Sequence, residues 1–376
     1  MINEPRLIEQ FLTMVAIGSE SFREKALRDY LQSEFLKRGL EIEEDDAARL
    51  IGGNCGNLLV RVPGNVNLSP LLLSAHLDTV TPGENIQAVV GEDGCIRSTG
   101  PTILAADDKA GIAAILEVLD VLAEENQPRP PLEILLTVCE EQGLLGARHF
   151  DFTRLKSRIG YTLDSDGAPG GIVVKSPAQN EINYKVYGRA AHAGMNPEDG
   201  INAIQVMAYA LSQMPCGRID PETTCNFGMI DGGQARNIVA EYCHVQGEAR
   251  SLNPQRLESL TEELQQTFIT AVESRGARAA VEVNFLYPAV VLDHDEPVVS
   301  LAAQAAEQLD LPVSYKKTGG GSDAAVIYGH GIRCANLAMG MRAAHTQEEH
   351  IYVNDLINVV KWVLTIIDHY VKEGLR

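Results

Sequence analysis

The stretch Leu71-Leu72-Leu73-Ser74-Ala75-His76-Leu77-Asp78-Thr79 carries most of the information about the fold. Its leucines form a short apolar run, which predicts a buried strand. His76 and Asp78 follow where that strand ends, and side chains two residues apart on a strand point to the same side. An imidazole suits zinc and related metals, and a nearby carboxylate can hold its other ring N–H. Taken alone, the pattern also fits a hydrogen-bonded core histidine followed by a polar turn.

The composition is that of a soluble globular protein with room for two domains. The chain has 376 residues, 45% hydrophobic and 22% charged. A formal net charge of −20 without a basic stripe argues against nucleic acid and anionic membranes as partners. Seven cysteines without a Cys-x-x-Cys motif indicate free thiols in a reducing compartment. No signal peptide or membrane-spanning run is visible, so we expect a cytoplasmic protein.

Two more predicted strands end in acids. An apolar run at 132–138 is followed by Glu140 and Glu141, and another at 159–163 is followed by Asp164. Strands separated by helices predict a sheet with parallel members, and such sheets bind ligands beyond the carboxyl ends of their strands. We therefore expect these acids to lie near His76.

A further pair of acids, Asp107 and Asp108, precedes a strongly amphipathic helix that begins near Ile112. Carboxylates at a helix start often cap the helix and complement its dipole. The pair therefore fits either ordinary capping or a place in the metal site.

The pattern changes between residues 178 and 288. The predicted order is strand 181–189, helix 199–213, strand 225–231, strand 240–251, helix 254–275 and strand 280–287. This βαββαβ order predicts a ferredoxin-like α+β domain inserted into the chain. We therefore predict a main α/β domain at 1–177 and 289–376, with a mixed, mainly parallel sheet flanked by helices, and an inserted domain at 178–288.

The acids and histidines form a chemically coherent set. Two histidines and three carboxylates suit a two-metal site in which one carboxylate bridges the ions. The candidate ligands are His76, Asp107, Glu141, Asp164 and His345. A pair of ions about 3.5–4 Å apart can activate a shared water and polarise a carbonyl. A further carboxylate is needed to take the proton of that water, and Glu140 lies beside a candidate ligand.

In these residues the sequence resembles the M20 family of metallopeptidases, and most closely its peptidase T (tripeptide aminopeptidase) branch. The ordered set of motifs is specific and spans nearly the whole chain, although each motif alone is weak. The matching segments are Ser74-Ala75-His76-Leu77-Asp78-Thr79-Val80, Ala106-Asp107-Asp108-Lys109-Ala110-Gly111, Glu140-Glu141-Gln142-Gly143, Asp164, Gly188 with His192-Ala193-Gly194 and Pro197, and His345-Thr346 with Glu349. Ala105 stands where the branch usually has glycine, but this change removes no ligand.

The resemblance implies two divalent ions, with zinc expected and manganese or cobalt as alternatives. His76 and Asp164 would hold one ion, Glu141 and His345 the other, and Asp107 would bridge them. In the family a cis peptide bond often follows the bridging aspartate.

The resemblance also implies roles beyond the ligands. Asp78 would orient the first histidine, and Glu140 would act as general base and then as general acid. His192 would stabilise the oxyanion, in related dimers from the partner's side, although an ordinary polar loop residue is the alternative. Asn237 and Arg250 would contact substrate, but a structural salt bridge explains Arg250 equally well.

The implied activity is release of the N-terminal residue from short peptides, with the inserted domain as lid and homodimer surface. The same ligands would serve a carboxypeptidase, a dipeptidase or an N-acyl amino-acid deacylase. A non-catalytic metal-binding scaffold on the same fold is a further alternative. The sequence leaves these choices open.

Overall fold

The computed structural model describes residues 1–375, which form two compact units. Unit 1 comprises Met1–Val174, Val291–Lys317 and the chain from Ser322 onward. Unit 2 comprises Lys175–Val290 and Thr318–Gly321. The sequence had suggested boundaries at 177/178 and 288/289, and it had left the glycine-rich segment Thr318–Gly321 in the main domain.

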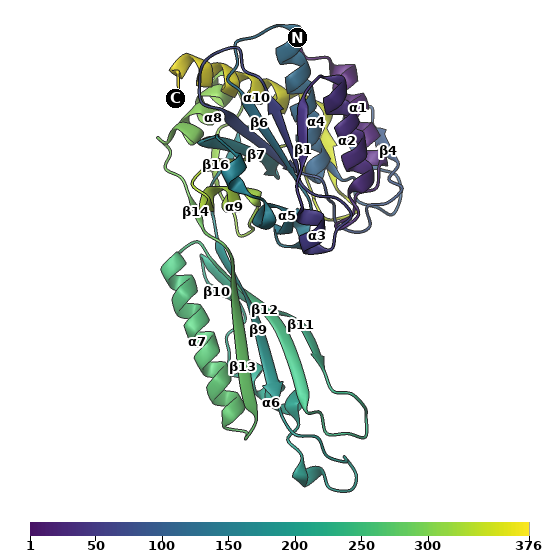
Figure 1. Cartoon of the computed structure of the whole chain (residues 1–376), viewed down its shortest axis with the longest axis vertical. Helices are drawn as coiled ribbons and strands as arrows, with labels where there is room; N and C mark the ends of the chain where they lie inside the picture. Colours follow the sequence, from purple (N-terminus) through teal and green to yellow (C-terminus); the bar gives the residue numbers. More distant parts are fainter. Residues whose placement is uncertain (376) are drawn as a thin grey trace. The chain divides into compact units, whose positions relative to one another are not determined.

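Within residues 1–375, unit 1 is built on a nine-stranded mixed sheet (Figure 1). Its strands are β1 (Glu41–Glu44), β2 (Leu58–Val62), β3 (Leu71–His76), β6 (Leu132–Thr137), β7 (Ile159–Ser165), β8 (Gly171–Ser176), β14 (Val290–Val291), β15 (Ser314–Lys317) and β16 (Arg333–Ala338). Their order is β1-β2-β6-β3-β7-β16-β8-β14, and β15 pairs with β8. The four central strands, β6, β3, β7 and β16, run parallel, which confirms the predicted mixed, mainly parallel sheet.

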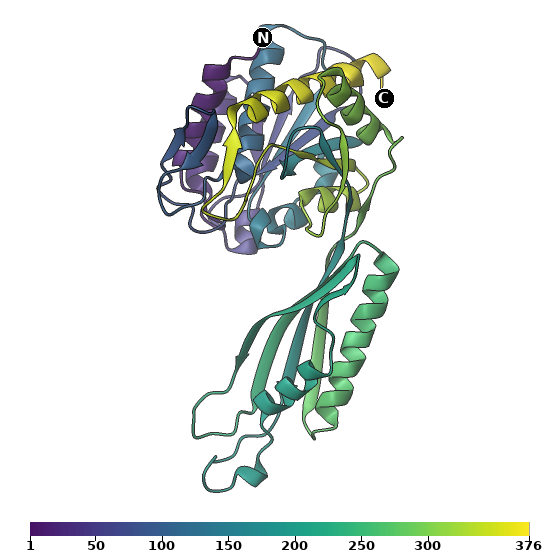
Figure 2. The ribbon, with the colours of Figure 1, turned by 180° about the vertical axis from the view of Figure 1, so that it is seen from behind.

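Helices pack around this sheet. They are α1 (Glu4–Ala16), α2 (Lys25–Lys37), α3 (Ala47–Ile51), α4 (Ala106–Glu124), α5 (Leu145–His149), α8 (Pro297–Gln308), α9 (Asp323–Gly329) and α10 (Val353–Glu373). The helix α4 is buried along most of its length and packs against β3 and β7, with α1 and α10 against it. Figure 2 shows α10 in yellow from behind. None of the helices in the described part of the chain is long and apolar enough to span a membrane.

Unit 1 also carries a small sheet of order β17-β5-β4. Its strands are β4 (Ala88–Val90), β5 (Cys95–Ser98) and β17 (His350–Tyr352). Short 3₁₀ turns occur at Glu140–Gln142, Phe152–Arg154 and, in unit 2, Pro197–Asp199. All seven cysteines are free, as the sequence predicted.

Unit 2 is an antiparallel sheet with two helices on one face (Figure 1). Its elements are β9 (Ala178–Tyr187), α6 (Ala203–Ser212), β10 (Gly217–Asp220), β11 (Thr223–Gly232), β12 (Tyr242–Ser251), α7 (Pro254–Glu273) and β13 (Arg278–Tyr287). The strand order is β10-β11-β12-β9-β13, and side chains from the sheet, α6 and α7 form one apolar core. The ferredoxin-like order is confirmed, and β10 is an additional strand that the sequence did not reveal.

The register of the central strands brings their carboxyl ends to one edge of the sheet. All six residues of β3 are buried, and β3 lies between β6 and β7. His76 is opposite Thr137 of β6, while Ser74 is opposite Thr162 of β7. The segments that follow these strands therefore start beside one another.

Gly111 lets the first turn of α4 approach the end of β7. A Cβ atom at this position would lie 2.4 Å from the carbonyl oxygen of Leu163 and 2.5 Å from Oδ1 of Asp108. The Gly111 amide donates to that same Oδ1 at 3.2 Å. Any side chain here would push the aspartates at the start of α4 away from the strand ends.

We expect Gly111→Ala to lower the free energy of unfolding by about 1–3 kcal/mol, because overpacked backbone must shift. Urea unfolding would measure the change. Gly100→Ala is the matched control, since a Cβ there meets nothing within 4 Å. Equal stability of the two variants would contradict this account of Gly111.

Candidate metal centre

The His76 ring has two nitrogens in different surroundings. Its Nδ1 lies 2.9 Å from the carbonyl oxygen of Asp78, and this contact assigns the N–H to Nδ1. The other nitrogen, Nε2, lies 2.9 Å from Oδ1 of Asp107 and 3.6 Å from Oδ1 of Asp164. With its proton on Nδ1, the ring presents a lone pair to two carboxylates, an arrangement that calls for a cation between them.

A second imidazole repeats this pattern. Nε2 of His345 lies 2.7 Å from Oε1 of Glu141 and 3.2 Å from Oδ2 of Asp107. Hydrogen bonds to Asp107 and then Glu141 raise the pKa of His345 to about 10. A protonated imidazole is one way to supply positive charge between these carboxylates, and a metal ion is the other.

Asp107 lies between the two histidines and contacts both. Its Oδ1 faces His76 and its Oδ2 faces His345, so each oxygen belongs to a different histidine. The peptide bond between Asp107 and Asp108 is cis, as the family resemblance implied. The structure thus brings together all five predicted ligands, including His345, which is 269 positions after His76 in the sequence.

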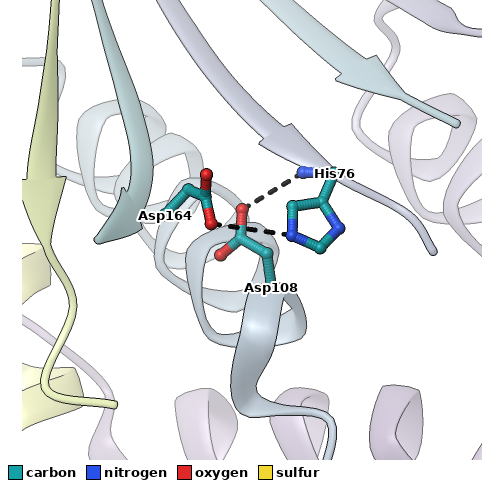
Figure 3. Close-up of side chains that lie close together, drawn as sticks. All are labelled: His76, Asp108 and Asp164. Atoms are coloured by element: carbon teal, nitrogen blue, oxygen red, sulfur yellow. Dashed lines mark hydrogen bonds and ion pairs between the residues drawn. The ribbon is translucent and has the colours of Figure 1, made fainter. Parts of the chain in front are cut away.

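Asp108 is a buried member of the centre that the sequence interpretation did not assign. Its carboxylate, His76 and Asp164 form one compact group, shown in Figure 3. Oδ2 of Asp108 accepts from the His76 backbone amide at 3.1 Å, and Oδ1 accepts from the Gly111 amide. Because both oxygens already accept backbone N–H groups, Asp108 fastens α4 to β3. In the sequence, only its place next to Asp107 indicated that Asp108 could belong to the centre.

Asp78 follows His76 by two residues and is fully buried. Its Oδ1 accepts from the Glu140 amide at 2.8 Å, and its Oδ2 accepts from the Glu141 amide at 3.2 Å and the Ser21 hydroxyl at 2.7 Å. The carboxylate is 3.5 Å from Nδ1 of His76, farther than the main-chain carbonyl. The expected role of Asp78 in orienting His76 stays a prediction: its carbonyl oxygen contacts the ring most closely, and its carboxylate also holds the Glu140–Gln142 turn.

Glu140 begins that turn and is largely buried. Burial, followed by the negative charge of Asp164, raises the pKa of its carboxyl well above the ordinary value. The residue is next to Glu141 in the chain, so the turn presents two carboxyls to the same edge of the sheet. A buried carboxyl of raised pKa is suited to proton transfer.

Two residues in the last part of the chain support the centre, and the sequence interpretation gave neither a role. Oδ1 of Asn336, on β16, accepts from the Asp164 amide at 3.1 Å. Glu349 accepts three backbone amides from the loop that leads to Asp107. Both interactions join residues far apart in sequence, so spacing gave no sign of them.

In unit 2, the structure brings His192 and Asn237 together. The amide of Ala193 donates to the Asn237 carbonyl at 3.0 Å, and Nδ1 of the exposed His192 accepts from the amides of Gly194 and Met195. Both residues lie in loops beyond the same end of the sheet.

Arg250 lies at the opposite end of that sheet. It pairs with Gln179 in the strand register, whereas Tyr242 at the other end of β12 pairs with Tyr187. Eight residues along a strand span about 26 Å. Its guanidinium contacts Glu248 through two hydrogen bonds, of 3.0 and 2.9 Å, so the salt bridge considered as an alternative is present.

The donor set fits divalent metal. Zinc bonds to imidazole nitrogen and carboxylate oxygen are about 2.0–2.1 Å, so tetrahedral ligand atoms lie about 3.3 Å apart. The separations at His76 and His345 run from 2.7 to 3.6 Å. One candidate group is His76, Asp107 and Glu141, whose ligand atoms lie within 4.8 Å of one another.

A mixed sheet whose carboxyl edge gathers imidazoles and carboxylates in this way defines the class: a metal-dependent hydrolase. The chain belongs to peptidase family M20/M25/M40, whose family model matches residues 72–369, and it is a metallopeptidase. The family predicted from the sequence is thereby confirmed.

Three relatives match over nearly the full length. The YqjE protein of Bacillus subtilis is 40% identical and covers 99% of this chain and 100% of its own length. The structure of aminopeptidase PepT from Bacillus cereus has 40% identity and a TM-score of 0.88, covering 98% of this chain and 99% of that one. A tripeptidase structure from Staphylococcus aureus has 37% identity and a TM-score of 0.91, covering 99% and 100%.

Proposed function

We propose that the protein is a two-metal aminopeptidase that releases the N-terminal residue from short peptides. The observation that carries the proposal is Asp107, which offers one carboxylate oxygen to His76 and the other to His345. The substrate class is supported by the two similar structures, one of an aminopeptidase and one of a tripeptidase.

In this proposal each ion has one histidine and one acid of its own. His76 and Asp164 would hold the first ion, His345 and Glu141 would hold the second, and Asp107 would serve both. Nitrogen and oxygen ligands suit zinc, and manganese or cobalt are the alternatives. When bound, such a pair lowers the pKa of a water and polarises the scissile carbonyl.

The residues of the chain then hold and move the proton. Glu140, buried next to Glu141, accepts the proton of the attacking water and returns it to the departing amine. The Asp78 carboxylate fixes the main chain of both glutamates through their amides. Because that carboxylate is fully buried, the turn has little freedom to move away from the site.

A homodimer through unit 2 is also part of the proposal. His192 and Arg250 lie at opposite ends of one sheet, too far apart for a short peptide to touch both within one unit 2. Within the described residues, β10 pairs only with Thr223, Thr224 and Cys225 of β11. The rest of that edge carries Met229 and Ile230, which are 68% and 63% exposed. Exposed apolar edge strands are usually covered, and a second copy is the proposed cover.

We expect Glu140→Ala to retain its ions and to lose about 10²–10⁴-fold in kcat, since only the proton carrier is removed. Peptide hydrolysis and metal content per chain would be measured on the same sample. Glu140→Gln, which keeps the shape, should behave alike. Undiminished turnover in either variant would refute the role of Glu140.

The substrate class is tested with a tripeptide, its N-acetylated and C-amidated forms, a dipeptide and an N-acyl amino acid. The enzyme would be loaded separately with zinc, manganese or cobalt. We expect cleavage of the first peptide bond and its loss on N-acetylation. Release of the C-terminal residue would indicate a carboxypeptidase, and cleavage of the acyl compound alone a deacylase. Absence of any cleavage with all three metals would favour a scaffold.

Mixing two inactive variants tests the dimer. If His192 serves the partner's site, His192→Ala and Glu140→Ala chains refolded together should recover about a quarter of wild-type activity. Half of randomly formed dimers are then mixed, and each mixed dimer has one complete site. No recovery, with mixed dimers verified by differential tagging, would mean that His192 does not act across the dimer.

A further inference from the structure

Glu349 is a buried carboxylate that spans two loops of the metal centre. Only 1% of the residue is exposed. Its Oε2 accepts from the amides of Leu104 and Ala105, both at 2.8 Å, and its Oε1 accepts from the Asp107 amide at 3.0 Å. Both oxygens are therefore committed to the main chain of a loop that is more than 240 positions earlier in the sequence.

The loop that Glu349 holds has an irregular backbone. Ala105 has φ +64°, and Asp107 and Asp108 depart from helical angles although they open α4. Ala105 at the N-cap makes no side-chain capping hydrogen bond, and Asp108 accepts only the amide of Gly111, farther into the helix. Backbone amides at a helix start lack partners inside the helix and need another acceptor when buried. The Glu349 carboxylate supplies that acceptor from a distant part of the chain.

The same residue closes the loop that carries His345. Glu349 follows His345 by four positions, and its amide donates to the Thr346 carbonyl at 3.2 Å. Two main-chain hydrogen bonds between Arg342 and His350, of 3.0 and 3.1 Å, join the two ends of this loop. Glu349 therefore fastens the loop of His345 directly to the loop of Asp107.

We propose that Glu349 is a positioning residue that sets the distance between Asp107 and His345 and thereby the affinity for the second ion. This inference rests on the two-ion site proposed above. His76 is on a fully buried strand, so its position does not depend on this contact. His345 is on a loop, and its side chain is 52% exposed. Loss of the Glu349 contact should therefore affect the ion at Glu141 and His345 more than the other.

The test is metal binding to Glu349→Gln. Glutamine keeps the shape but has one acceptor oxygen, and its NH₂ group would face an amide donor. We expect the zinc affinity of the site at Glu141 and His345 to fall about 10–100-fold, so that calorimetry on protein freed of metal shows one of the two affinities reduced and the other little changed. Hydrogen exchange of the metal-free protein should quicken at residues 104–107.

Glu348→Gln is the matched control, because Glu348 is the exposed neighbour of Glu349 and has no place in the site. It should leave both affinities and the exchange rates unchanged. Glu349→Asp keeps the charge but is one methylene shorter, so it should reach fewer amides and give an intermediate affinity. This second variant serves if Glu349→Gln fails to fold.

The outcomes separate the two proposals. Wild-type protein that binds fewer than two ions contradicts the two-ion site itself. Wild-type protein that binds two ions, with equal affinities in the Glu349 variants, leaves that site standing and overturns the positioning role. A lower melting temperature with unchanged affinities would also overturn it, because Glu349 would then serve stability alone.

Discussion

The structure depends on the burial of several carboxylates at one edge of a mixed sheet, where its parallel central strands end. An ionised carboxylate removed from water needs hydrogen-bond donors or a cation, or it takes up a proton. In this protein the carboxylates divide by how that need is met. Asp78, Asp108 and Glu349 accept backbone amides with both oxygens. Asp107, Glu141 and Asp164 instead face imidazole nitrogens.

This division distinguishes a supporting carboxylate from a candidate ligand more clearly than position in the chain does. Asp107 and Asp108 are adjacent and both buried or nearly so, yet one faces two histidines and the other holds the main chain. Likewise, Glu348 is exposed while Glu349 is buried. A carboxylate whose oxygens already accept amides has little capacity left for a metal, whereas one that faces only imidazoles requires positive charge.

Much of the fold could be predicted from the sequence, because three of the central strands are short, nearly continuous apolar runs. The runs in β3, β6 and β7 are apolar on both faces, as expected of strands covered by helices. No strand was assigned to β16, where the run Arg333-Cys334-Ala335-Asn336-Leu337-Ala338 lacks β-branched residues. The short strands β1 and β10 were also missed, since four residues carry too little periodicity to detect.

Much of the candidate site could also be predicted, because several of its residues directly follow the predicted strands. Side chains that meet at strand ends can be predicted once the strands are known, and His76, Glu141 and Asp164 were proposed in this way. Asp107, at a helix start, and His345 were added because they complete a two-metal donor set and match the motifs of the family. Contacts between a side chain and a distant main chain leave no spacing signal. That is why Asn336, Asp108 and Glu349 were not assigned, and why the amide contacts of the Asp78 carboxylate were not predicted.

The two imidazoles also differ in their access to solvent. Only 2% of the His76 side chain is exposed, whereas 52% of the His345 side chain is. Solvent thus reaches the ring of His345 directly, whereas the ring of His76 is almost completely covered. Any ligand that exchanges between the centre and bulk water therefore meets the imidazole of His345 before that of His76.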